Sequence, residues 1–270
     1  MTNFQAIVIA IVEGLTEFLP VSSTGHMIIT QHLLGIPSTD FLKAYMVIIQ
    51  LGAILSVVVL YFKRFFQSFN FYWKLLAAFI PAAVIGLIFG DAIDAMLGDV
   101  SVVAWALVIG GVILFFFDKM MLPWKLEGRD ELNPEKMGFG HAVMIGLFQC
   151  VAMIPGVSRS AATIIGGMIG PFNRKQAAEF SFFLAVPTML GATAKKGYDL
   201  YKISPQLITD HVQELLIGNA VAFVVGLIAI KTFIGILNKY GFRAFGIYRI
   251  IIGAAILLML QWGIQLNFVD

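Results

Sequence analysis

Charged residues are scarce in this sequence of 270 residues. Asp, Glu, Lys and Arg together make up 13% of the chain, about half of their usual share in soluble domains, while the residues AVILMFWYC make up 59%. The mean hydropathy is +0.89. These values exclude an ordinary soluble domain and predict an integral membrane protein. A net charge of +2 is too small to indicate nucleic-acid binding, so we expect no nucleic-acid partner.

The sequence also has a single cysteine and few segments in which polar and apolar residues alternate as they do in strands. Cys150 is the single cysteine, which excludes an intrachain disulfide and a cysteine-based metal site. The apolar runs are long rather than short and alternating, so they indicate helices and not the strands of a barrel. We therefore expect an all-α polytopic membrane protein that forms a single membrane domain over residues 1–270.

A helix that crosses a membrane takes about 20 apolar residues. Six apolar runs are predicted to do so, although some of them are short. Pro81 and Pro187 interrupt two of these runs, so we expect tilted or kinked helices there. The predicted transmembrane helices cover residues 42–62, 75–89, 102–117, 177–194, 215–237 and 247–262.

Two other apolar stretches, residues 4–34 and 139–169, are interrupted by proline, glycine and hydroxyl residues. Each is long enough for two half-helices. A break in the backbone at membrane depth is tolerated only where protein or a water-filled cavity satisfies its polar groups. We therefore expect two re-entrant helical hairpins, each of which enters and leaves the membrane by the same side.

The two halves of the chain resemble each other. GLTE and PVSS at residues 14–17 and 20–23 are similar to GLFQ and PGVS at residues 146–149 and 155–158. Each half then contains one hairpin and three spans, and an odd number of crossings inverts the second half relative to the first. We predict an inverted-topology repeat, with residues 1–118 as the first copy, residues 119–138 as a cytoplasmic linker and residues 139–270 as the second copy.

The distribution of Lys and Arg among the loops predicts the orientation of the protein in the membrane. Basic residues gather around residues 63–74 and in the linker, and the positive-inside rule places both loops in the cytoplasm. Lys195, Lys196 and Lys202 then fall outside and count against this orientation. On balance we expect both termini on the outer side.

Glu13 and Glu17 lie four residues apart, so they share one face of a helix. A charge at membrane depth costs on the order of 3 kcal/mol, so intramembrane carboxylates indicate a functional site. Two carboxylates this close suit either a divalent cation such as Mg²⁺ or Ca²⁺, or an acid–base pair that shares a proton. The alternative is a pair of glutamates that reach the membrane surface.

The run SSTGH at residues 22–26 follows the break at Pro20. Ser23 and His26 could act as nucleophile and base if the turn brings them together. Serine and threonine also often cap the helix that follows a break. The residue types leave both interpretations open.

The second interrupted stretch contains the motif PGVSRSAAT at residues 155–163. Arg159, the hydroxyls of Ser158, Ser160 and Thr163, and free backbone N–H groups are expected to gather at a helix N-terminus, which is a ready anion site. Several hydroxyls beside an arginine favour a phosphate. The alternative is an ion pair between Arg159 and one of the two glutamates of the first stretch.

Residues 13–26 and 155–163 resemble the two signature motifs of the bacterial undecaprenyl-pyrophosphate phosphatase family associated with bacitracin resistance. Length and span pattern extend the resemblance over essentially the whole chain. It implies an enzyme of the bacterial inner membrane, with its active site facing the periplasm, that removes the terminal phosphate from a C55 polyprenyl diphosphate with the help of a divalent cation. The product is the monophosphate carrier that is used in peptidoglycan synthesis.

The residues fit this reaction. The two glutamates would hold Mg²⁺ or Ca²⁺, and Arg159 with the hydroxyls of the second motif would bind the substrate phosphate. We favour attack by Ser23 with His26 as the base, while attack by His26 or by cation-activated water stays open. Membrane lipids are expected partners, and a homodimer stays open. The rival interpretation is a secondary transporter or flippase of an anionic lipid or solute, because inverted repeats with broken helices are also found in transporters.

Four other polar residues receive lesser roles. Gln50 and Gln149 are expected to line the cavity between the motifs. Tyr248 and Arg249 begin the last predicted span and are expected to anchor it at the cytoplasmic edge.

Overall fold

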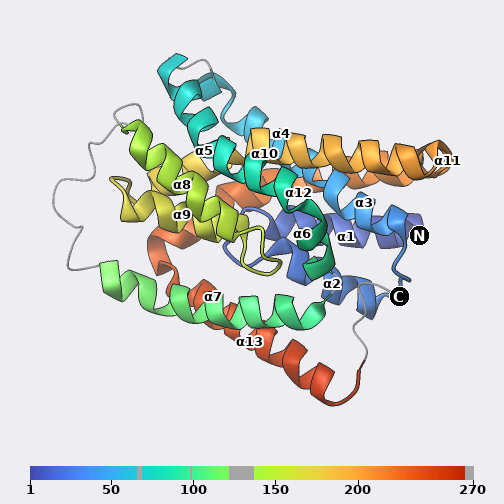
Figure 1. Cartoon of the computed structure of the whole chain (residues 1–270). Helices are drawn as coiled ribbons and strands as arrows, with labels where there is room; N and C mark the ends of the chain where they lie inside the picture. Colours follow the sequence, from blue (N-terminus) through green and yellow to red (C-terminus); the bar gives the residue numbers. More distant parts are fainter. Residues whose placement is uncertain (66–68, 98, 122–136, 265–270) are drawn as a thin grey trace.

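Helices joined by short connections make up the computed structural model, which describes residues 1–65, 69–97, 99–121 and 137–264 (Figure 1). Within these ranges there is no strand, which confirms the all-α prediction. The elements are α1 (Asn3–Thr16), α2 (Ser23–Leu33), α3 (Asp40–Ile48), α4 (Gln50–Leu60), the 3₁₀ helix η1 (Phe62–Phe65), α5 (Phe69–Ile88), α6 (Gly90–Leu97), α7 (Val100–Met121), α8 (Phe139–Val151), α9 (Arg159–Ile169), α10 (Arg174–Ile203), α11 (Pro205–Thr209), α12 (Val212–Tyr240) and α13 (Arg243–Gln261).

Six helical segments in the described part of the chain are long and apolar enough to cross a membrane, as the sequence predicts. Some extend well past the apolar runs. Helix α10 has 30 residues and includes the charged residues at both ends of the predicted span 177–194, because long charged side chains can reach water while the backbone stays helical. The six segments are Asp40–Leu60, Phe69–Ile88, Val100–Met121, Arg174–Ile203, Val212–Leu237 and Arg243–Gln261.

The predicted linker falls largely on residues 122–136, which lie outside the described residues. On either side of them, α7 continues to Met121 and α8 begins at Phe139. The division of the chain into two repeats and a linker therefore stays a prediction.

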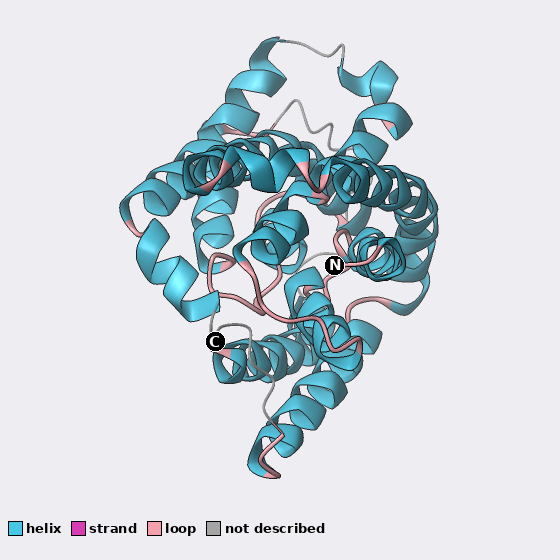
Figure 2. Ribbon diagram, turned by 90° about the vertical axis from the view of Figure 1, so that its right-hand side faces the viewer, coloured by secondary structure: helices cyan, strands magenta, loops and turns pink. Residues whose placement is uncertain are grey.

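Both interrupted stretches are broken where the sequence predicts. Residues 17–22, called the first loop, separate α1 from α2, and residues 152–158, called the second loop, separate α8 from α9. Figure 2 shows loop segments, drawn in pink, in the middle of the surrounding helices. Helical breaks therefore lie inside the protein, where side chains and cavities can satisfy the freed backbone groups.

The helix before each loop packs directly on a long helix from the other half of the chain. Helix α1 contacts α12, and α8 contacts α5. Glycine permits both close approaches. A Cβ atom on Gly14 would lie 2.9 Å from the carbonyl oxygen of Ala222, and one on Gly146 would lie 2.4 Å from that of Ala78. The two pairs therefore meet backbone to backbone.

Helices α7 and α13 lie side by side along one edge of the molecule (Figure 1). Glycine again sets their distance, since a Cβ atom on Gly111 would lie 2.8 Å from the carbonyl oxygen of Gly246. This close packing brings Arg249, in the first half of α13, within hydrogen-bond distance of both loops.

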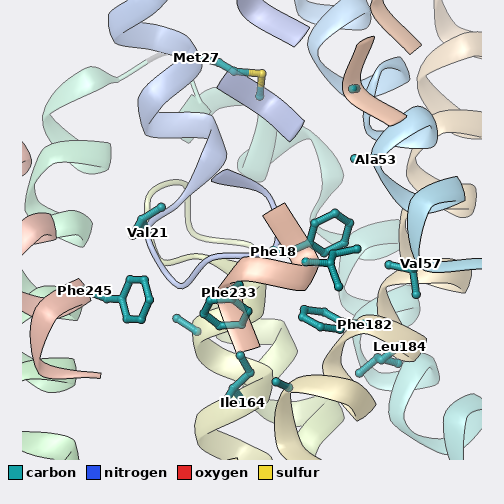
Figure 3. Packing of buried hydrophobic residues seen from close by; sticks show 14 of the residues in the cluster. Phe18, Val21, Met27, Ala53, Val57, Ile164, Phe182, Leu184, Phe233 and Phe245 are labelled. Carbon is teal, nitrogen blue, oxygen red and sulfur yellow. The ribbon is translucent and has the colours of Figure 1, made fainter. Parts of the chain in front are cut away.

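Phe18, in the first loop, points into the apolar core (Figure 3). Its ring lies 5.4 Å from that of Phe182 in α10 at an interplanar angle of 86°, and the ring of Phe182 lies 6.1 Å from that of Phe233 in α12. Such aromatic pairs contribute about 0.5–1.5 kcal/mol each beyond their burial. Phe18, which follows Glu17 in the first loop, thus packs against α10 directly and against α12 through Phe182.

Candidate active site

The two loops end in the same backbone conformation. Ser22 and Ser158 are the two non-glycine residues with positive φ in the described ranges, at 70° and 77°. Each caps the helix that follows: the Ser22 Oγ accepts a hydrogen bond from the amide of Gly25 at 3.5 Å, and the Ser158 Oγ accepts one from the amide of Ala161 at 3.3 Å. A non-glycine residue in this region costs on the order of 1–3 kcal/mol, so surrounding contacts must hold both loops in place.

A cavity of about 220 Å³ lies where the loops meet, and both sequence motifs contribute to its wall. Gln50 and Gln149 line it, as expected from the sequence. Thr188 of α10 also lines it and donates a hydrogen bond to Gln149 at 3.2 Å. The motif residues in the wall are Glu17, Ser22, Ser23, Thr24, Pro155, Gly156, Ser158 and Arg159.

Glu17 connects the two motifs. The hydroxyl of Ser23 donates a hydrogen bond to Glu17 Oε2 at 2.6 Å, and Arg159 Nη2 donates one to Glu17 Oε1 at 2.9 Å. The side chains of Arg159 and Glu17 are 12% and 5% exposed, so the ion pair is shielded from water. The ion pair that the sequence left as an alternative is therefore present, and it lies at the wall of the cavity.

Ser181 of α10 holds the other side of the Arg159 guanidinium. Arg159 Nη1 donates to the carbonyl oxygen and to the hydroxyl of Ser181, at 3.0 and 3.2 Å. Arg159 Nε is buried and has no hydrogen-bond partner among the described groups. The arginine therefore keeps one donor for a further acceptor. Sequence reasoning missed Ser181, because a single serine inside an apolar span gives no signal of its own.

Ser160 and Thr163 contact protein groups and are not among the residues that line the cavity. The Ser160 hydroxyl donates to the carbonyl oxygen of Leu19 in the first loop at 2.8 Å. The Thr163 hydroxyl lies 2.7 Å from that of Ser181 and donates to the carbonyl oxygen of Arg159 at 2.8 Å. In this structure both hydroxyls hold the loops and α10 together, and their predicted contact with phosphate stays a prediction.

Glu13 is fully buried, and neither carboxylate oxygen has a hydrogen-bond partner in the described structure. Its charged neighbours are Glu17 and Arg159, and the Ser23 hydroxyl is a polar neighbour. Across the described ranges no three His, Cys, Asp or Glu side chains meet in a metal-binding group. Unpartnered carboxylate oxygens beside a second carboxylate and a hydroxyl nevertheless form the all-oxygen donor set that Mg²⁺ and Ca²⁺ prefer, with water to complete the shell. These residues fit a divalent cation.

His26 lies away from the cavity wall. Its Nδ1 is 2.7 Å from the carbonyl oxygen of Ser22, its Nε2 is 2.7 Å from the hydroxyl of Tyr248, and the His26 and Tyr248 rings are stacked with centroids 5.5 Å apart. Both ring nitrogens are therefore engaged, and the hydrogen bond of Ser23 goes to Glu17 instead. The structure does not bring Ser23 and His26 together as a nucleophile–base pair.

Arg249 is not the surface anchor that the sequence suggested. Its side chain is completely buried, and its guanidinium donates to backbone carbonyls of both loops and of α7. The expectation was wrong because the start of an apolar run does not show which side of the helix faces the protein. A charge inside the predicted span 247–262 was the signal that could have identified it.

Comparison with known proteins places these residues in a family context. Residues 6–255 match the family model described as "Bacitracin resistance protein BacA". The chain is 58% identical to the "Undecaprenyl-diphosphatase" of Flavobacterium johnsoniae over 96% of both chains, and 52% identical to that of Bdellovibrio bacteriovorus over 100% of both chains. It is 44% identical to the protein of the same name from Campylobacter jejuni, over 98% of this chain and 97% of the relative.

Proposed function

The chain belongs to the bacitracin resistance protein BacA family, and from this premise we propose that it is an undecaprenyl-diphosphate phosphatase of the membrane. It converts the C55 polyprenyl diphosphate to the monophosphate carrier and inorganic phosphate, which supplies the carrier for peptidoglycan synthesis. The names of its relatives support this activity. The structural observation that carries it is the position of Glu17, which joins a hydroxyl nucleophile and an arginine at the wall of one cavity.

The geometry favours Ser23 as the nucleophile and Glu17 as its proton acceptor, because the two groups share a hydrogen bond of 2.6 Å. A bond forms between Ser23 Oγ and the terminal phosphorus while the serine proton moves to Glu17. The bond from that phosphorus to the bridging oxygen breaks, and Glu17 passes its proton to the departing prenyl monophosphate. Water then attacks the phosphorus of the phosphoserine and the bond from Ser23 Oγ to that phosphorus breaks. One proton of the water passes by way of Glu17 to Ser23 Oγ, and inorganic phosphate leaves.

Arg159 binds the phosphoryl oxygens in this proposal. Its buried Nε, which has no partner among the described groups, offers one donor, and its Nη2 becomes a second when a phosphate oxygen replaces Glu17. Charge that develops on the transferred group is then stabilised by a guanidinium that Ser181 already holds in orientation. When Arg159 Nη2 binds the phosphate, its bond to Glu17 is lost, and Glu17 can then accept the proton of Ser23.

Glu13, Glu17 and Ser23 are the residues that would hold a divalent cation. When bound, Mg²⁺ or Ca²⁺ would offset the repulsion between the two carboxylates and the diphosphate. The buried and unpartnered oxygens of Glu13 support this assignment.

The same proposal includes an inverted-topology repeat with two re-entrant hairpins, in the bacterial inner membrane and with the cavity open to the periplasm. Three observations support it. Helix α1 packs on α12 as α8 packs on α5, Gly14 and Gly146 make the corresponding contacts, and both loops end in a serine with positive φ. The basic loops indicate which side is cytoplasmic. The homodimer stays a prediction.

The test uses purified protein in detergent with undecaprenyl diphosphate and Mg²⁺ or Ca²⁺. We expect release of inorganic phosphate, loss of this release on chelation, and its recovery when the cation returns. A folded protein that releases no phosphate under these conditions would overturn the proposal and favour transport of the lipid. Right-side-out vesicles that hydrolyse added substrate without permeabilisation would support a site open to the periplasm.

A further inference from the structure

Arg249 of α13 is a buried cation whose hydrogen bonds, within the described residues, go to backbone groups. Its side chain is 0% exposed, and in the described structure its hydrogen bonds go to carbonyl oxygens rather than to a carboxylate. The acceptors are Leu107 at 3.4 Å from Nε, Ala106 at 3.0 Å and Gly156 at 2.9 Å from Nη2, and Pro20 at 3.2 Å and Val157 at 2.9 Å from Nη1.

These acceptors come from three separate parts of the chain. Pro20 belongs to the first loop, Gly156 and Val157 belong to the second loop, and the other two belong to α7. The carbonyl oxygens of Pro20 and Val157 accept from the same nitrogen, so the two loops meet at Arg249. A guanidinium presents five donors in a rigid plane and can satisfy such a set, whereas an ammonium has three donors on a flexible stem.

Helix α7 leaves space for this guanidinium at one position. A Cβ atom on Gly110 would lie 2.3 Å from Arg249 Nη2 and 2.9 Å from its Cζ. Any side chain at residue 110 would therefore push the guanidinium out of its place while leaving every donor of Arg249 intact.

The bonded carbonyls are close in sequence to the reacting groups. Pro20 lies between Glu17 and Ser23, and Val157 is followed by Ser158 and Arg159. Residues 22 and 158 have the strained backbone with positive φ, which needs such external contacts. The preceding residue of α13, Tyr248, adds a hydrogen bond to His26 in the first turn of α2.

We propose that Arg249 is a positioning residue whose guanidinium fixes the first loop against the second, so that Ser23 and Glu17 face Arg159. It touches no reacting atom. Its effect on turnover rests on the proposed phosphatase function, whereas its effect on the loops does not. Because a displacement of about 1 Å of reacting groups can lower a rate on the order of a hundredfold, the loss of this contact acts mainly on kcat.

The experiment compares the wild type with Arg249→Lys, Gly110→Ala and the control Gly235→Ala. No atom of the described residues lies within 4 Å of a Cβ built on Gly235, so this control introduces a methyl group into open space. Hydrogen–deuterium exchange of peptides that cover residues 17–22, 152–158 and α12 is measured on the full chain in detergent. Phosphate release from undecaprenyl diphosphate gives kcat and KM for the same samples.

We expect faster exchange in both loops, unchanged exchange in α12, and a kcat at least tenfold lower with KM within about twofold for Arg249→Lys and Gly110→Ala. Gly235→Ala should match the wild type. Wild-type exchange in both loops, or faster exchange along the whole chain including α12, would overturn the proposal. If Arg249→Lys does not fold, Gly110→Ala decides, and if the wild type releases no phosphate, the exchange of the two loops decides alone.

Discussion

The first and second loops end in the same backbone conformation, but different side chains lie on and next to them. Each interrupts a helix, ends in a serine with positive φ, and caps the next helix with that serine. The residue after the serine is Ser23 in one case and Arg159 in the other. A carboxylate, Glu17, is contributed by the first loop, and it is bonded to both of these residues.

This difference teaches that the site is assembled across the two loops. Glu17 of the first loop and Arg159, which follows the second loop, would each be a buried charge without the other, and breaking a buried ion pair by removing one side costs about 3–5 kcal/mol. The paired loops satisfy these charges in the absence of substrate. Under the proposed function, a phosphate that enters between them would compete with Glu17 for Arg159, which would link substrate binding to the activation of Ser23.

Removal of the Arg159 side chain, at the first position of α9, should have the largest effect. Arg159→Ala leaves Glu17 unpaired and removes the phosphate donors, so kcat/KM for phosphate release should fall about a thousandfold, equivalent to about 4 kcal/mol. Arg174→Ala is the matched control, because it breaks a more exposed ion pair with Asp118 outside the cavity. A folded Arg159→Ala variant with wild-type turnover would contradict the proposed site.

Glu13 has the next largest expected effect. Glu13→Gln removes a buried carboxylate whose oxygens have no partner among the described residues, so the melting temperature should stay equal or rise while phosphate release falls about a hundredfold. The concentration of Mg²⁺ or Ca²⁺ for half-maximal activity should also rise. Glu214→Gln serves as the control, since Glu214 lies in the first turn of α12 beside His211. An unchanged cation requirement would remove Glu13 from the cation site.

Substitution of Gly14 and of Gly146 tests whether the helices before the two loops pack equally closely. Gly14→Ala and Gly146→Ala should each destabilise the protein by about 1–3 kcal/mol, because the added methyl group meets a backbone carbonyl. Gly146→Ala should have the larger effect, since its approach is the closer one. Gly140 also lies in α8, and a Cβ atom built on it meets no described atom within 4 Å, so Gly140→Ala should melt like the wild type. A lower melting temperature for only one of the two variants would argue against equivalent packing of α1 on α12 and of α8 on α5.

The two strained serines should give the smallest effects. In Ser22→Ala and Ser158→Ala, the strain stays and the cap is lost, so each variant should lose about 1 kcal/mol of stability. Glycine accepts positive φ without strain, so Ser22→Gly and Ser158→Gly should be more stable than the alanine variants. Thermal unfolding of the four variants measures this. A glycine variant less stable than its alanine counterpart would show that the backbone strain is absent.

Much of the fold follows from the sequence. The six apolar runs predict the six long helices, because burial in lipid requires continuous apolar surface and a helical backbone. Proline, glycine and serine in the two motifs predict the breaks that the first and second loops contain. Cavity-lining roles for Gln50 and Gln149 also follow, since polar residues inside apolar stretches need polar surroundings.

The partners of individual side chains do not follow from the sequence. Ser23 and His26 are three residues apart in one motif, yet the serine bonds to Glu17 and the histidine to Tyr248. Spacing along the chain gives no direction for a side chain after a turn with positive φ. The bond between Ser23 and Glu17 is set by the turn of the first loop. Contacts of α2 with α13 and of α9 with α10 decided the bonds from His26 to Tyr248 and from Arg159 to Ser181.

By itself the sequence determined that this protein is a helical membrane protein with two polar motifs at helix breaks, because composition and local backbone preference act within a short stretch of chain. Only the tertiary structure decided that the motifs meet in one cavity and that Arg249 lies between the loops instead of at the membrane surface. A buried cation takes the position where enough acceptors converge, and those acceptors come from residues more than 90 positions away.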